Sequence, residues 1–112
     1  MAKTQDKELR RGTLEMLLLK LLASRPMYGY EIMATMEKLG QGQFNLKEGT
    51  VYPVLYRLEM DGFILSQWET LERGVPRKYY RLSETGAGEM DRLIQEWRTF
   101  SAAVTRILET ER

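Results

Sequence analysis

The sequence predicts a mainly α fold of the α+β class, with three helices, then a two-stranded β-hairpin, and finally a long helix. Three observations support this order. Apolar residues recur at three- and four-residue steps in the first half of the chain, short aromatic and β-branched runs follow Gly62, and helical spacing returns before the C-terminus. A chain of 112 residues is the size of one domain, so a long segment outside its first core is expected to pack on a partner.

The first two helices are predicted from apolar periodicity and from the residues that end them. Leucines recur at helical spacing from about Asp6 to Ala23, so this segment forms a helix with one broad apolar face, which Ser24-Arg25-Pro26 ends. The second helix covers Met27 to Leu39. Gly40-Gln41-Gly42 follows it with residues suited to a left-handed C-terminal cap.

A third helix is predicted over about Lys47 to Asp61. Its apolar stripe consists of Val51, Leu55 and Leu58. Gly62 supplies the stop.

The start of this third helix can be placed in two ways. Asn45 and Glu48 have the spacing of a capping box. Pro53 instead fits best if the regular helix begins at Gly49 or Thr50, because proline is favoured in a first turn. We therefore expect an irregular first turn.

A β-hairpin follows the third helix. Phe63 to Trp68 and Lys78 to Leu82 are aromatic and β-branched runs, and Glu72 to Pro76 supplies turn residues between them. Ser83 or Thr85 can then cap a last helix that starts near Thr85 and reaches the C-terminus.

The last helix carries an apolar seam with alternating spacings of three and four residues. Its members are Met90, Leu93, Trp97, Phe100, Val104 and Ile107. Such a seam is typical of a helix that packs on a partner helix.

Composition argues against an enzyme. The chain has no histidine and no cysteine, which removes imidazole bases, thiol nucleophiles and Cys/His zinc sites, so we expect no catalytic residues, no metal and no cofactor. The acidic pair Glu69 and Glu72 lies in a polar stretch, where nothing favours raised pKa values. No secretory signal and no membrane-spanning run is visible, so a cytoplasmic protein without membrane contact is expected.

Three helices followed by a two-stranded wing is the order of a winged helix-turn-helix, in which the third helix enters the major groove of DNA. On that helix Thr50, Pro53 and Arg57 fall on a side away from the apolar stripe, with Tyr52 and Tyr56 between them. Hydroxyls and guanidinium groups suit phosphates and base edges. The alternative is plain solvent exposure, above all for the single arginine.

Charge is unevenly distributed along the chain. Residues 71–81 contain four basic residues and one acid, a balance of +3, which suits a phosphate backbone or simply protects an exposed strand edge. The N-terminal stretch has Lys3, Lys7, Arg10 and Arg11 against two acids, a balance of +2. Residues 84–112 have six acids and four basic residues, a balance of −2. Positive charge therefore gathers in the parts expected to face DNA.

Four segments together resemble the PadR-like transcriptional regulators. They are Met27-Tyr-Gly-Tyr-Glu-Ile32, Lys47 to Glu59 with Gly-Thr-Val-Tyr-Pro at its centre, Asp61-Gly-Phe-Ile64, and Arg77-Lys-Tyr-Tyr-Arg-Leu82. The resemblance covers nearly the whole chain and is closest to the smaller subgroup with one C-terminal helix. Val75-Pro76 departs from the glycine or basic residues that many relatives carry in the wing.

The resemblance implies a winged helix-turn-helix DNA-binding domain over residues 1–84 and a C-terminal dimerisation helix over residues 85–112, in one compact unit. It further implies a homodimeric repressor that binds double-stranded DNA at an inverted-repeat operator and is released by a small hydrophobic or aromatic effector. The expected DNA contacts are Tyr28, Lys47, Thr50, Tyr52, Pro53, Arg57, Arg77 and Lys78.

The same resemblance suggests an effector site on the last helix. Drug-binding relatives carry a tryptophan there that sandwiches flat aromatic ligands, and Trp97 occupies this seam, with Leu14, Met90, Phe100 and Val104 as expected neighbours. Trp97 could equally fill the dimer core. Two other functions stay open: a winged-helix module that binds protein instead of DNA, and a small-molecule binder without regulatory output.

Overall fold

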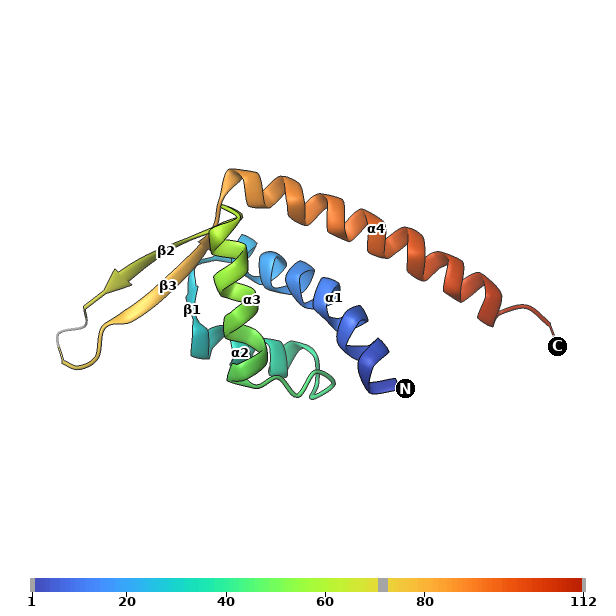
Figure 1. Ribbon diagram of the computed structural model, residues 1–112, viewed down its shortest axis with the longest axis horizontal. Coiled ribbons are helices and arrows are strands. Elements are labelled where there is room, and N and C mark those ends of the chain that lie inside the picture. Colours follow the sequence, from blue (N-terminus) through green and yellow to red (C-terminus); the bar gives the residue numbers. More distant parts are fainter. Residues whose placement is uncertain (1, 71–72, 112) are drawn as a thin grey trace.

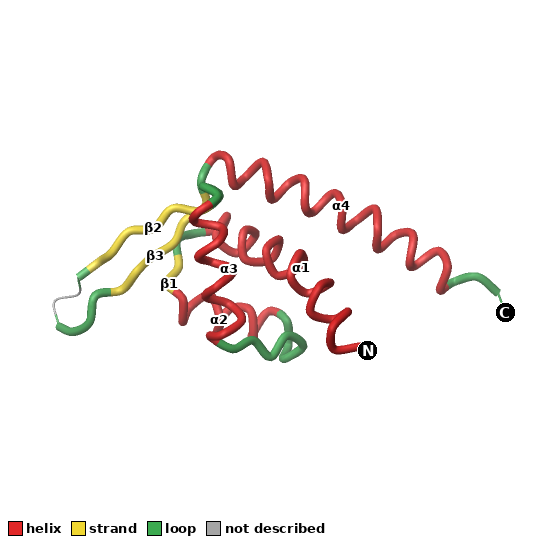
Figure 2. Tube along the Cα trace, viewed as in Figure 1, coloured by secondary structure: helices red, strands yellow, loops and turns green. Residues whose placement is uncertain are grey.

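The computed structural model describes residues 2–70 and 73–111, with side chains from residue 12 onward. Within these ranges the chain forms four helices and a small antiparallel sheet (Figures 1 and 2). The helices are α1 (Ala2–Ser24), α2 (Gly29–Leu39), α3 (Glu48–Met60) and α4 (Glu84–Leu108), and the strands are β1 (Met27–Tyr28), β2 (Ile64–Glu69) and β3 (Arg77–Leu82). This architecture confirms the predicted fold class.

The sheet contains one strand more than the predicted hairpin. Strands β2 and β3 pair in register from Ile64 opposite Leu82 to Glu69 opposite Arg77, and β1 pairs with the other edge of β3. The second helix was expected to start at Met27 but begins at Gly29, because Met27 and Tyr28 form β1. A strand of two residues is too short to show an alternating pattern, so only its pairing reveals it.

The core lies where α1 meets the other helices and the sheet. Leu18 and Leu19 of α1, Ile32 of α2, Leu55 of α3 and Ile64 of β2 are fully buried there. Figure 2 shows α1 lying beside both α3 and α4. Because α1 contacts α3, α4 and β3, it is the element that holds α3 and α4 in one body.

The first turn of α3 differs from both predicted starts. The helix begins at Glu48 after the extended Lys47, whose carbonyl accepts from the N–H groups of Thr50 (2.9 Å) and Val51 (3.0 Å). Asn45 has a positive φ of 48° and lies outside the helix. One carbonyl shared between two donors is common at a helix terminus, so the expected irregular first turn stays a prediction. Pro53 lies inside the helix.

Helix α4 starts at a well-defined cap. The Ser83 hydroxyl accepts from the Gly86 N–H (2.9 Å) and donates to the Gly62 carbonyl (2.6 Å). Gly86 approaches the Phe63 carbonyl so closely that a Cβ atom would collide with it, which explains a glycine in a first helical turn. The cap therefore fixes α4 to the end of α3.

From this cap, α4 runs past α1 and gives the molecule an elongated shape, with extents of 62 × 28 × 23 Å (Figure 1). Met90 and Leu93, near its start, pack against the core. Trp97, Phe100 and Ile107 farther along are 44%, 55% and 71% exposed. The predicted seam is thus covered in its first part and uncovered in its second. No helix in the described ranges has the length and apolar character needed to cross a membrane.

Candidate nucleic-acid interface

The N-terminal half of α3 presents several of the residues expected to bind DNA. Lys47, Thr50 and Pro53 are exposed, and Tyr52 is partly exposed. Buried Val51, like the rest of the predicted stripe, turns to the core and directs these residues outward. This end of the helix is therefore free to approach a duplex.

Tyr52 also fixes α3 against α2. Its phenol lies so close to the Cα of Gly29 that a Cβ atom there would collide with the hydroxyl. Only glycine allows this approach at the first turn of α2. Tyr52 is thus a positioning residue as well as an expected DNA contact.

Arg57 lies at the flank of α3 that faces α1, not with the exposed residues of the N-terminal half. Its guanidinium Nη2 is 2.8 Å from Glu15 Oε2 on α1, and 36% of the side chain is exposed. Helical spacing alone predicts an outward side for Arg57, because its carboxylate partner lies 42 positions away in the chain. The ion pair ties α3 to α1, and a DNA contact by Arg57 stays a prediction.

Lys78 is held in a similar way on the inner face of the hairpin. Its ammonium is 3.2 Å from Glu59 Oε1 of α3 and 5.3 Å from the ring centroid of Tyr80, and the Ser66 hydroxyl donates to the same carboxylate. The bond from Ser66 lowers the pKa of Glu59, burial opposes it, and Lys78 lowers it further. Burial acts to lower the pKa of Lys78, but Glu59 and Tyr80 outweigh it and the pKa is raised. Lys78 and Glu59 thus join the wing to α3 as a charged pair.

Arg77 lies on the opposite face of the hairpin, over an aromatic cluster. Its guanidinium carbon is 4.4 Å from the ring centroid of Tyr28, which packs edge-on against Tyr79 (5.4 Å between centroids) and stacks with Tyr30 (6.5 Å). Pairing of β1 with β3 brings Tyr28 and Arg77 together from motifs 49 residues apart. Arg77 is exposed, and the cluster forms one surface that carries a cation.

Three other exposed residues were not among the expected DNA contacts. Tyr56 and Met60 lie on the outward side of α3, and Trp68 lies on β2. The sequence places Tyr56 between the expected contacts, with a hydroxyl suited to a phosphate. The period-2 alternation of β2 places Trp68 on the same face as buried Ile64, a position at which a buried side chain is expected, so its exposure could be seen only in the fold.

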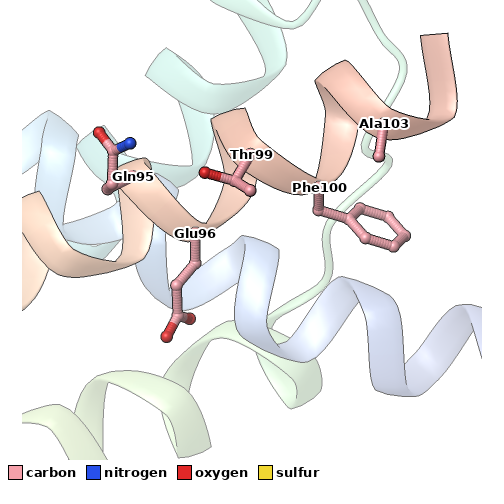
Figure 3. Close-up of a pocket in the computed structure, with 5 residues that line it drawn as sticks. All are labelled: Gln95, Glu96, Thr99, Phe100 and Ala103. Carbon is pink, nitrogen blue, oxygen red and sulfur yellow. The ribbon is translucent and has the colours of Figure 1, made fainter. Parts of the chain in front are cut away.

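The residues expected at an effector site separate into two groups. Leu14 is buried in the core and Met90 packs against that core. Trp97 and Phe100 are exposed neighbours, with ring centroids 6.4 Å apart. An open depression of about 500 Å³ involves only α4, and Figure 3 shows its lining residues. They are Gln95, Glu96, Thr99, Phe100 and Ala103.

The polar edge of this depression is fixed by charge. Glu96 accepts from Arg92 Nη1 (2.6 Å), and Arg92 Nη2 also donates to Glu89 (2.7 Å). The bond from Arg92 lowers the pKa of Glu89. Among the described side chains, no cluster of acidic residues is arranged to hold a metal ion.

Comparisons with known proteins agree with this arrangement. Residues 18–92 match the model of the transcriptional regulator PadR-like family. The chain is 31% identical over 99 residues to an uncharacterised protein of Lysinibacillus sphaericus, covering 88% of this chain and 91% of that protein.

Solved structures of regulators share the fold. A transcriptional regulator from Clostridium thermocellum is similar with a TM-score of 0.83 and 26% identity, over 91% of this chain and 99% of its own. A PadR-like regulator from Bacillus cereus has a TM-score of 0.79 and 28% identity, over 93% and 99%. A PadR family regulator from Eggerthella lenta has a TM-score of 0.77 and 34% identity, over 98% and 94%.

Members of this family regulate transcription through a winged helix and are not enzymes. An exposed α3 end, a cation-bearing wing and a family match over the segment that contains both lead to one conclusion. The chain belongs to the PadR-like family and is a DNA-binding transcriptional regulator.

Proposed function

We propose that the protein is a homodimeric repressor of the PadR-like family that binds an inverted-repeat operator and is released by a small aromatic effector. The observation that carries the proposal is the uncovered apolar half of α4, on the same body as the exposed end of α3. A winged helix that reads a palindrome needs a two-fold partner, and this face offers a surface for one.

In the proposed complex, the N-terminal half of α3 enters the major groove. Thr50, Tyr52 and Pro53 face base edges and the adjoining backbone, and Lys47 at the start of the helix binds a phosphate. Two copies related by a two-fold axis would place their recognition helices about 34–36 Å apart, one turn of DNA. Residues 1–84 would act as the DNA-binding part.

The wing and α2 would grip the phosphate backbone beside that groove. Arg77 is the leading cation, because it is exposed and supported by the ring of Tyr28. Lys78 and Arg57 would contribute less, since each already has a carboxylate partner that a phosphate must replace. Their first role is to hold the wing and α3 in place.

Residues 85–112 would form the dimer contact and the effector site. Phe100, Val104 and Ile107 would pack on the same residues of the second copy, burying surface that is exposed in one chain. Trp97 and Phe100 would line a slot between the two copies for a flat aromatic molecule. Leu14 and Met90 would support this slot from the core.

A mobility-shift titration with the DNA upstream of the protein's own coding sequence tests the proposal. We expect a complex of one dimer per operator, with affinity that falls steeply as salt rises. Light scattering should give twice the mass of one chain. A protein-interaction module would shift no duplex even at low salt, and that result would refute DNA binding as the function.

The effector is tested separately by fluorescence. Flat aromatic cations should quench the tryptophan emission of the wild-type protein, and the Trp97→Phe variant should lose this quenching while retaining the signal of Trp68. Quenching that survives in Trp97→Phe would place the ligand elsewhere.

A further inference from the structure

An exposed tryptophan on the wing has no role in the proposal above. Trp68 lies near the end of β2 and is 64% exposed. Among the described side chains, no aromatic pair and no part of the apolar core includes it. A large apolar ring at this place contributes little to the fold, and aromatic residues of this kind are enriched in binding surfaces.

The orientation of Trp68 follows from the pairing of the hairpin. Trp68 is directly opposite Lys78 and two residues from Ser66, so all three share one face of the sheet. Ser66 and Lys78 both bond Glu59 on α3. The indole therefore lies on the wing face that turns toward α3, level with Lys78 and farther along the hairpin than Ser66.

The charge of the wing favours DNA as the partner of Trp68. Lys78 lies opposite Trp68 on the same face and pairs with Glu59, and the exposed Arg77 and Arg81 lie on the other face of the same strand. The wing thus carries cations on both faces beside the indole, and a duplex offers phosphates to the cations and deoxyribose rings to the indole. The wing also continues directly from the α3 surface that approaches DNA.

We propose that Trp68 is a DNA contact: its indole packs against deoxyribose at the rim of the minor groove beside the groove that α3 occupies. The inference rests on the proposed DNA binding and adds an apolar component to it. Apolar side chains inserted into the minor groove are a known way to gain contact with DNA. The indole N–H can also donate to a phosphate or a base acceptor.

This contact has a signature that separates it from an ionic one. Alanine at Trp68 removes apolar burial and no charge, so we expect about a tenfold loss of affinity that is the same at every salt concentration. Arg77→Ala should instead reduce the slope of log affinity against log salt by about 0.9. In mobility-shift titrations, Trp68→Ala should therefore give a line parallel to that of the wild type.

Matched variants separate contact from folding. Gln67→Ala, one residue away on the other sheet face, should leave DNA affinity unchanged, and Trp68→Phe should restore part of the loss. Thermal melting checks that each variant folds. Unchanged affinity in Trp68→Ala overturns the inference, and so does a loss that Trp68→Phe fails to reduce in a folded protein.

Spectroscopy on the wild-type protein tests the same contact directly. Labelling with 5-fluorotryptophan gives two fluorine resonances, which Trp68→Phe and Trp97→Phe assign. Addition of operator DNA should reduce the solvent isotope shift of the Trp68 resonance, because the indole leaves water. A complex in which Trp68 stays as accessible as before refutes the inference and leaves the proposed function intact.

Two further outcomes would also refute it. If Trp68→Ala changed the mass of the protein in solution, Trp68 would belong to a contact between copies. If wild-type protein bound no duplex at all, the proposed function itself would fail.

Discussion

The centre of the molecule and its two extremities satisfy their side chains in different ways. At the centre, where α1, α3 and the inner face of the wing meet, apolar residues are buried and Arg57 and Lys78 each have a carboxylate partner. Along the wing and the far half of α4, Arg77, Trp68 and Phe100 face solvent. From the sequence alone, residues in both kinds of region were expected to bind a partner molecule.

This difference teaches that basic residues of the same type can serve either the stability of the fold or the binding of a partner. A cation between α3 and α1 or between α3 and β3 stabilises the arrangement that presents the DNA surface. A cation over the outer sheet face is open to a phosphate. Changes at the centre should therefore alter stability, and changes at the extremities should alter association.

The largest effect is expected from the core. Leu19 is fully buried, so Leu19→Ala should lower the free energy of unfolding by about 2–5 kcal/mol. Ile107→Ala should change it by less than about 0.5 kcal/mol in a single chain, because that side chain is exposed. Urea denaturation in a background kept monomeric by Phe100→Glu and Val104→Glu measures both. Equal losses would mean that the far half of α4 is part of the chain's own core.

The same two substitutions to glutamate test whether the far half of α4 is an association surface. Phe100→Glu with Val104→Glu should give a monomer by light scattering and lower operator affinity by roughly 100-fold or more, because the two half-sites are no longer bound together. Ala102→Glu adds one such negative charge on the opposite side of α4, where Ala102 is exposed, and should stay dimeric. A dimer that survives the double substitution would contradict the proposed interface.

A smaller effect separates the two adjacent cations of the wing. Arg77→Ala should reduce the salt slope of DNA binding by about 0.9, the value for one lost phosphate contact. Lys78→Ala should reduce it by less, because the ammonium is already paired with Glu59 at 3.2 Å. Mobility shifts across salt concentrations measure both slopes. If the two variants had equal slopes of log affinity against log salt, Arg77 and Lys78 would contribute alike to phosphate binding, contrary to this prediction.

The smallest effect concerns the acid stability of the central contact. The pKa of Glu59 is lowered from 4.5 by Ser66 and Lys78, so the folded state favours the carboxylate. The resulting stability is present above the unfolded pKa and is lost as pH falls through the lower folded value. With both partners near the surface, the contribution is about 0.5–1 kcal/mol.

The test compares urea denaturation at neutral and acidic pH. The wild type should lose this contribution below about pH 4.5, and Glu59→Gln should lack that part of the pH dependence. Glu48→Gln changes an exposed glutamate of the same helix and should behave as the wild type. A Glu59→Gln protein with the full acid sensitivity would show that the carboxylate does not hold the wing.

Much of the fold could be predicted because its signals are local. Apolar periodicity located all four helices, and alternation with turn residues located β2 and β3. The missed strand β1 has only two residues, and its partner lies about 50 positions away. The start of α3 was misplaced by a residue or two, since the cap depends on backbone geometry at Lys47 more than on residue type.

The expected DNA contacts were predicted less evenly. Exposure of Thr50 and Pro53 follows from their position away from the apolar stripe of Val51, Leu55 and Leu58, which any helix of this sequence would show. The pairing of Arg57 with Glu15 depends on the angle between α3 and α1. The separation of Leu14 and Met90 from Trp97 depends on where α4 leaves the core.

By itself, the sequence determined the order of elements, the apolar faces that build the core, and the motifs that place the chain in its family. These depend on residues close together in the chain, where spacing translates directly into a face. Only the tertiary structure decided which cations already have a carboxylate partner, which half of the α4 seam is covered, and that Trp68 is exposed. Such properties depend on distances between elements, and packing of the whole chain sets those distances.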